Sequence, residues 1–143
     1  MCLRGPGTTE LEREIARARR IKQPLVLAFV DVDGLKDIND SRGHSAGDRV
    51  LLQLAKSLKA ALRSHDLIIR YGGDEFACAV SGLNTAETTK RFASVHEALA
   101  SSPEPVTVTV GIVELRPGDS TKDLIDRADA AFYRQRQQER SSI

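Results

Sequence analysis

Two acidic turns hold the residues of this 143-residue chain that are best suited to chemistry. The first follows a continuous apolar run and reads Asp-Val-Asp-Gly at residues 31–34. The second separates two shorter apolar runs and reads Gly-Gly-Asp-Glu at residues 72–75. Paired glycines allow a tight reversal and let another molecule approach the backbone closely. The second turn therefore predicts a β-hairpin that directs the carboxylates of Asp74 and Glu75 outward together.

A cation site is one interpretation of these turns. If the apolar run before Asp31 and the hairpin are neighbours in one sheet, Asp31 and Asp74 converge at its edge, beside the carbonyl of Val32. Hard oxygen ligands of this kind suit Mg²⁺, which bridges to substrate phosphates when a protein supplies only one or two carboxylates. The alternative is that Asp31 caps a strand end and Asp74 is a solvated turn acid, and the residue types alone support both equally.

Candidate phosphate-binding groups flank the first turn and the C-terminus. Residues 34–36 (Gly-Leu-Lys) place backbone N–H groups and the Lys36 amine at an expected helix start, where phosphate oxygens bind readily. Arg136 and Arg140 lie one turn apart on the last expected helix and could grip a triphosphate together. Arginines near a helix C-terminus also complement its dipole on a solvated face, so this second interpretation stays open.

Asn39 and Asp48 form a candidate base-reading pair. An amide near a carboxylate can bind the donor edge of guanine through its N1–H and N2 amino groups. Polar loop residues and acids in a first helical turn are also common without such a role.

Hydrophobic periodicity and capping residues predict the elements that must position these groups. Helices are expected over about 9–20, 45–62, 84–102 and 120–140, strands over 25–30 and 106–112, a hairpin over 67–80, and one or two helical turns over 35–44. A Thr9–Glu12 capping box is expected to open the first helix. Strands joined by one hairpin and by helical crossovers predict an α+β fold, with a mixed, mostly antiparallel sheet covered by helices.

Composition is that of a single soluble globular domain, with 41% hydrophobic and 29% charged residues. A formal net charge of +1 provides no general field to attract nucleic acid or a membrane surface. No apolar run approaches the length of a membrane span, and the first residues lack a signal-peptide core. We expect a tail over 1–7, one domain over 8–143, no nucleic-acid partner, no membrane insertion and a cytoplasmic location.

Several separated motifs together resemble the GGDEF family of diguanylate cyclases. The name-giving motif is Gly72-Gly73-Asp74-Glu75-Phe76, and residues 31–40 (DVDGLKDIND), 43–44 (GH) and 47–48 (GD) match the upstream pattern at its usual spacing. Residues 127–136 are similar to the family's C-terminal helix. The resemblance extends from about residue 24 to residue 140.

The resemblance implies a palm-like catalytic domain, related to nucleotidyl cyclases and polymerases, that condenses two GTP into cyclic di-GMP and two pyrophosphates. It implies Mg²⁺, with Mn²⁺ as a substitute, on Asp31, Asp74 and the Val32 carbonyl. The implied substrate-binding residues are Gly34, Leu35, Lys36, Asn39, His44, Asp48, Gly72, Gly73, Arg136 and Arg140. The implied catalytic residues are Asp74, Glu75 and Lys36. Turnover is expected to need a homodimer, assisted by a sensory or dimerising module.

An inhibitory product site is also implied. Residues 63–66 (Arg-Ser-His-Asp) match the family's RxxD motif, which stands five residues before the paired glycines. Arg63 can make paired hydrogen bonds to guanine or phosphate, and Asp66 can accept from a guanine edge. We therefore expect cyclic di-GMP to bind at Arg63 and Asp66.

Three departures from the family pattern accompany the match. The first ten residues lack the usual opening turn before the first helix, Thr109 replaces a common serine, and Glu139 stands where glycine is common. Two alternative functions remain open: a catalytically silent receptor for GTP or cyclic di-GMP, and another nucleotidyl transferase on the same fold. GTP turnover separates the first alternative from a cyclase, and turnover of ATP or of a template would indicate the second.

Overall fold

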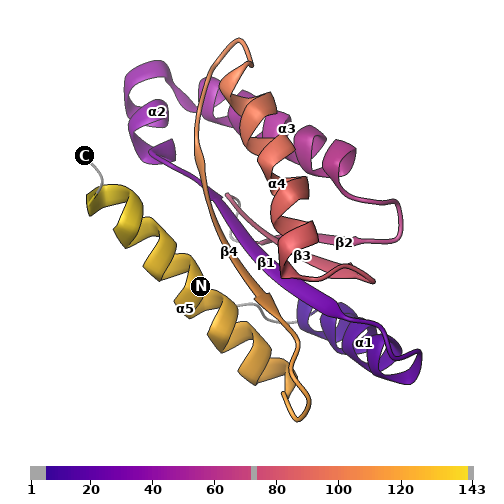
Figure 1. Cartoon of the computed structure of the whole chain (residues 1–143). Coiled ribbons are helices and arrows are strands. Elements are labelled where there is room, and N and C mark those ends of the chain that lie inside the picture. The colour runs from indigo at the N-terminus through magenta and orange to yellow at the C-terminus, as the bar shows by residue number, and fades with distance from the viewer. Residues whose placement is uncertain (1–5, 72–73, 142–143) are drawn as a thin grey trace.

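The computed structural model describes residues 6–71 and 74–141, without the side chains of residues 6, 71, 140 and 141. Its elements in chain order are α1 (Pro6–Arg20), β1 (Leu25–Val32), α2 (Leu35–Arg42), α3 (His44–Ala61), β2 (Leu67–Tyr71), β3 (Glu75–Ser81), α4 (Thr85–Ala100), β4 (Val108–Glu114) and α5 (Thr121–Ser141) (Figure 1). No helix in these ranges combines the length and the apolar content that a membrane span requires.

The strands form a four-stranded sheet in the order β2-β3-β1-β4. The α+β class is confirmed, and the sheet differs from the expected mixed one because each pair among the described strands is antiparallel. Asp31, near the end of β1, is opposite Glu75 on β3 and Thr109 on β4. The register therefore brings the two acidic turns to the same edge of the sheet.

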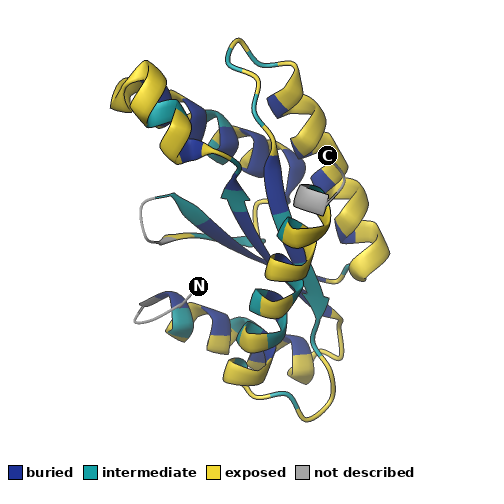
Figure 2. Ribbon diagram, turned by 90° about the vertical axis from the view of Figure 1, so that its left-hand side faces the viewer, coloured by how far each residue is buried: buried dark blue, intermediate teal, exposed yellow. Residues whose placement is uncertain are grey.

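Helices cover both faces of the sheet, which explains the uninterrupted apolar run of β1. Ala28, Val30 and Val32 pack in a core with α3 and α4, whereas Leu27 and Phe29 alternate into a second core with α1 and α5. Figure 1 shows α3 and α4 together on one side of the sheet, with α5 on the other. Figure 2 shows buried and intermediate strand segments between helices whose outer faces are exposed. Side chains alternate between the two faces of a strand, so Asp31 points to the same face as Phe29, which is the face that α5 covers.

Local capping signals located two of the helices correctly. Asn84 Oδ1 accepts from the Glu87 N–H at 2.8 Å, and Glu87 Oε1 accepts from the Asn84 N–H at 3.1 Å, which is a reciprocal capping box at the start of α4. Ser120 and Asp123 exchange two similar bonds, each of 3.0 Å, at the start of α5.

The predicted bounds of the first helix and of the last strand were wrong. The described part of the first helix extends back to Pro6, inside the expected tail. The Thr9–Glu12 pair therefore lies within α1 and does not cap it. The last strand begins at Val108 and continues to Glu114, two residues later than expected at each end.

Helix α5 lies against β4 at Gly111. A Cβ atom at this position would stand 2.3 Å from the backbone N of Phe132 and 2.5 Å from its Cα. Only glycine permits so close an approach of the two backbones. The contact places Arg136, one helical turn beyond Phe132, beside the end of β1.

Replacing Gly111 with alanine tests this contact. The added methyl group must push α5 away from the sheet, and we expect Gly111→Ala to lower the free energy of unfolding by about 1–3 kcal/mol. Urea denaturation followed by circular dichroism measures the change. Ala130→Ser, which adds one heavy atom on the exposed side of α5, is the control and should cost less than about 0.7 kcal/mol. Equal stability of Gly111→Ala and the parent would contradict the proposed close contact.

Candidate active site

A cavity of about 420 Å³ lies at the end of β1, where the acidic turns meet. Its lining residues are Asp31, Val32, Asp33, Gly34, Leu35, Lys36, Asp74, Arg136 and Glu139. The structure thus brings together Asp31, Val32 and Asp74, the residues of the expected metal site. Two expected phosphate-binding residues, Lys36 and Arg136, reach the same cavity from α2 and α5.

Arg136 partly offsets the acids of this cavity. Its guanidinium lies 3.5 Å from Asp31 Oδ2 and 3.2 Å from Asp33 Oδ1. The guanidinium carbon also stands 4.8 Å from the centre of the Phe132 ring, one turn earlier on α5. A cation over an aromatic face is attracted to the ring, so Phe132 helps to direct Arg136 toward the end of β1.

Asp33 is held by residues that the sequence interpretation missed. Thr107 donates to Asp33 Oδ2 at 2.7 Å, and the Thr109 hydroxyl lies 2.6 Å from Asp33 Oδ1. The same hydroxyl lies 2.8 Å from Glu139 Oε2. Asp33 follows Asp31 by two residues, and this spacing was the available signal that both acids share one side of the chain. Thr109 and Glu139 were noticed only as departures from a family pattern.

The pKa values of Asp31 and Glu75 are raised above their ordinary values. Burial raises the pKa of Asp31 from an ordinary 3.8 to about 6, the charges of Asp74 and Glu75 add to the rise, and Arg136 opposes it. Burial also raises the pKa of Glu75, again with a contribution from Asp74. Asp31 is the cross-strand partner of Glu75 and lines the same cavity as Asp74, so the three acids gather at one end of the sheet.

The donor set at the end of β1 is small and made of oxygen atoms. Within residues 6–71 and 74–141, no three or more His, Cys, Asp or Glu side chains are grouped so as to hold a metal ion by themselves. Asp31 and Asp74 supply two carboxylates and Val32 a carbonyl. Such a set suits Mg²⁺, which normally completes its shell with waters and phosphate oxygens.

The start of α2 presents backbone donors to the cavity. Gly34 adopts a left-handed φ of 69° and precedes Leu35, the first residue of the helix. The first N–H groups of a helix have no partner within it, so those of Leu35 and Lys36 are available to an anion. The expected phosphate cradle therefore has the required local geometry.

The expected base-reading residues lie farther along α2 and α3. Asn39 is half-buried on α2 and its Oδ1 atom has no hydrogen-bond partner. A Cβ at Gly47 would fall 1.8 Å from this oxygen, so Gly47 leaves the space that the Asn39 amide fills. His44 and Asp48 are exposed on the first turns of α3. An unpaired buried acceptor is costly, and Asn39 Oδ1 is packed against Gly47.

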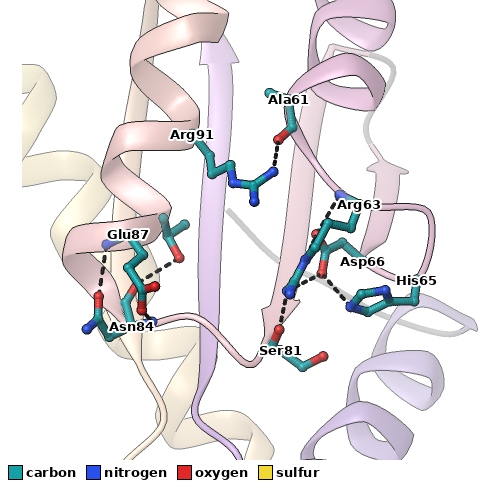
Figure 3. Close-up of polar contacts among 9 residues, drawn as sticks. Ala61, Arg63, His65, Asp66, Ser81, Asn84, Glu87 and Arg91 are labelled. Atoms are coloured by element: carbon teal, nitrogen blue, oxygen red, sulfur yellow. Dashed lines mark hydrogen bonds and ion pairs between the residues drawn. The ribbon is translucent and has the colours of Figure 1, made fainter.

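Arg63 and Asp66 form a tight pair outside the cavity (Figure 3). Asp66 accepts from the Arg63 backbone N–H at 2.8 Å and from its guanidinium at 3.1 and 3.3 Å. Arg63 also donates to the Ser81 carbonyl, and His65 approaches Asp66 at 3.8 Å. The Asp66 side chain is only 1% exposed, whereas that of Arg63 is 29% exposed. Asp66 therefore orients Arg63, and Arg63 is the member of the pair that solvent reaches.

Three expected site residues lie outside this description. Gly72 and Gly73 fall in the gap between the described ranges, and the side chain of Arg140 is among those not described. Their assignments stay predictions.

A second hollow of about 450 Å³ lies between α4 and α5 against β4. Its polar lining is mainly threonine and glutamine, with His96, Arg134 and Glu139. It lacks paired acids, so the cavity at the end of β1 is the candidate for phosphate chemistry.

The chain matches the family model described as "Diguanylate cyclase, GGDEF domain" over residues 6–142. It is 36% identical over 131 residues to diguanylate cyclase DgcP of Pseudomonas aeruginosa, which covers 87% of this chain and 20% of that protein. The active GGEEF domain of a diguanylate cyclase from Vibrio cholerae is similar in structure, with a TM-score of 0.85 and 29% identity, covering 91% of this chain and 87% of the other. The GGDEF domain of DgcB from Caulobacter crescentus, in complex with c-di-GMP, is also similar in structure, with a TM-score of 0.84 and 28% identity. The match covers 90% of this chain and 81% of the other.

The fold and the acid-lined cavity define a palm-like α+β domain suited to nucleotide phosphates. With the family match, this chain belongs to the GGDEF family of diguanylate cyclases. It spans 20–36% of the length of the curated relatives that it matches.

The raised pKa of Asp31 predicts a stability cost that depends on pH. The folded state prefers the protonated carboxyl, so the cost is absent below about pH 4 and complete well above pH 6. In EDTA at pH 8, Asp31→Asn should therefore unfold with a free energy on the order of 1–3 kcal/mol higher than the parent. The two proteins should converge at low pH.

Urea unfolding between pH 4 and pH 8 measures this difference. Asp126→Asn, which removes an exposed carboxylate paired with Lys122 at 2.6 Å, should change stability by less than about 1 kcal/mol at each pH. A destabilised Asp31→Asn variant at pH 8 would show that the ionised carboxylate benefits the fold.

Proposed function

We propose that this domain is a diguanylate cyclase that condenses two GTP into cyclic di-GMP and two pyrophosphates. The observation that carries the proposal is the convergence of Asp31, Asp74 and Arg136 on one cavity, in a chain of the GGDEF family. Paired acids with adjacent cationic and backbone donors match what phosphoryl transfer needs, namely charge stabilisation and positioning.

Each domain would bind one GTP along the start of α2. The carboxylates of Asp31 and Asp74 and the Val32 carbonyl would hold magnesium, or manganese in its place. Lys36 and Arg136 would bind the phosphates together with the backbone N–H groups after Gly34, and Gly72, Gly73 and Arg140 are assigned there by the family pattern.

The guanine end of the nucleotide would lie at the junction of α2 and α3. The Asn39 amide would bind the donor edge of the base, Asp48 would accept a second hydrogen bond, and His44 would line the same side. Arg136 would leave Asp31 and contact phosphate oxygens when the nucleotide enters.

Two domains facing each other would bring each 3′-hydroxyl to the α-phosphorus of the opposite GTP. A new oxygen–phosphorus bond forms, the bond to pyrophosphate breaks, and the hydroxyl proton passes to a base. Glu75, beside Asp74 and with a raised pKa, is suited to accept that proton. A bound magnesium ion supplies positive charge that stabilises the α-phosphate and the leaving pyrophosphate.

Turnover of GTP tests the proposal. The chain is fused to a dimerising coiled coil, so that weak pairing is not mistaken for inactivity, and product is measured by chromatography with GTP and Mg²⁺. We expect cyclic di-GMP from the parent and a loss on the order of 1000-fold in Asp31→Ala, because this variant lacks a carboxylate that would hold the magnesium ion whose charge stabilises the reacting phosphate. Asp126→Ala is the matched control and should retain full activity.

The same assay separates the alternatives. GTP binding without product would make the domain a silent receptor. Turnover of ATP in place of GTP would indicate a different nucleotidyl transferase. Product from the Asp31→Ala variant would remove Asp31 from the proposed site.

Cyclic di-GMP is proposed to inhibit by binding at Arg63. The buried Asp66 holds the guanidinium in place, and its partly exposed edge is available to guanine or phosphate. Calorimetric titration should show micromolar binding to the parent and at least a tenfold weaker affinity in Arg63→Ala. Lys90→Ala, an exposed cation on α4, is the control. Binding that Arg63→Ala leaves unchanged would place the product elsewhere, provided that circular dichroism shows the variant folded.

Dimerisation of two such domains would depend on an additional protein module. The matched relatives are about three to five times longer than this chain. We propose that a dimerising or sensory module, in the same polypeptide or in a partner protein, brings two domains together for turnover.

A further inference from the structure

Two acids of the cavity, Asp33 and Glu139, have no role in the proposed chemistry. Glu139 lies on α5 three residues after Arg136, is half-buried, and lines the cavity together with Asp31, Asp33 and Asp74. It also lines the hollow between α4 and α5. The Glu139 side chain therefore forms part of the wall between the two spaces.

Thr109 fixes the position of this carboxylate. The Thr109 hydroxyl is fully buried and stands 2.8 Å from Glu139 Oε2 and 2.6 Å from Asp33 Oδ1. A hydroxyl has one proton to donate, so the two carboxylates share a single donor. The guanidinium of Arg136 is directed to Asp31 and Asp33. Glu139 is thus held at the cavity wall by a neutral group.

The charge balance of the cavity is negative before any ligand enters. Four acids line it, namely Asp31, Asp33, Asp74 and Glu139, against two bases, Lys36 and Arg136. A polyphosphate without its cation adds several more negative charges, and like charges in a partly desolvated space repel strongly. A polyphosphate that carries a divalent cation brings charge of the opposite sign to the same acids.

We propose that Glu139 excludes metal-free polyphosphate from this cavity, so that nucleotide is admitted together with its divalent cation. The identity of the nucleotide as GTP rests on the proposed function, whereas the exclusion rests on the charge of the phosphate chain. Glu139 acts on specificity and takes no part in bond making.

Isothermal titration of the full chain with sodium tripolyphosphate in EDTA tests the proposal, and Mg·GTP in a buffer without EDTA is the second titrant. Glu139→Gln keeps the shape and the hydrogen bond to Thr109 and removes the charge. We expect it to bind metal-free tripolyphosphate about tenfold more tightly than the parent, with less than a threefold change for Mg·GTP. The tenfold gain should shrink as salt rises from 0.05 to 0.5 M, because screening weakens charge repulsion.

Asp126→Asn is the matched control. It removes a carboxylate from the same helix 13 residues earlier, about 20 Å along the axis, and should leave both affinities unchanged. A gain in Asp126→Asn equal to that in Glu139→Gln would reduce the effect to net charge and overturn the proposal.

The remaining outcomes are also decisive. Unchanged or weaker tripolyphosphate binding by Glu139→Gln, or no binding by either protein, overturns the proposal. Loss of Mg·GTP binding in Glu139→Gln makes Glu139 a metal ligand and overturns it too. If tripolyphosphate shows the gain but no protein binds Mg·GTP, the proposed cyclase function fails and the exclusion stands. If GTP is turned over but Glu139→Gln does not bind tripolyphosphate more tightly than the parent, the cyclase function stands and the exclusion fails.

Discussion

Like charges forced together at the end of β1 are the constraint on which the candidate site depends. Asp31, Asp33 and Asp74 share one cavity, and Arg136, which pairs with Asp31 and Asp33, comes from a helix about a hundred residues after these two acids. Arg136 reaches them because Gly111 lets the backbone of α5 approach β4 and because Phe132 lies under the guanidinium. The packing of α5 therefore determines the electrostatics of the site.

The arrangement favours ligand binding over stability. Burial raises the pKa of Asp31, so its charged form is held in the fold at a cost. Asn39 likewise keeps a buried oxygen without a partner. Both costs are of the kind that a bound cation or a hydrogen-bond donor would remove, which is the usual compromise between stability and function at a binding site.

The Arg63–Asp66 pair has a different character from the cavity. Its two charges neutralise each other, and Asp66 is almost completely buried between the guanidinium and the backbone of the segment after α3. It ties this segment to Ser81 at the end of β3. One edge of Arg63 stays accessible in a rigid setting, so a ligand could bind there without first ordering the side chain.

The sequence by itself determined the local structure: the hairpin at the acidic turn, the capped starts of α4 and α5, the apolar central strand and the glycine before α2. These features depend on residues within about four positions of one another or on simple alternation. Only the tertiary structure decided that Arg136 pairs with Asp33 and that Thr109 stands between Asp33 and Glu139. These residues are 30 to 103 positions apart. Their meeting follows from strand register and from the close packing of α5 on β4, which no local pattern encodes.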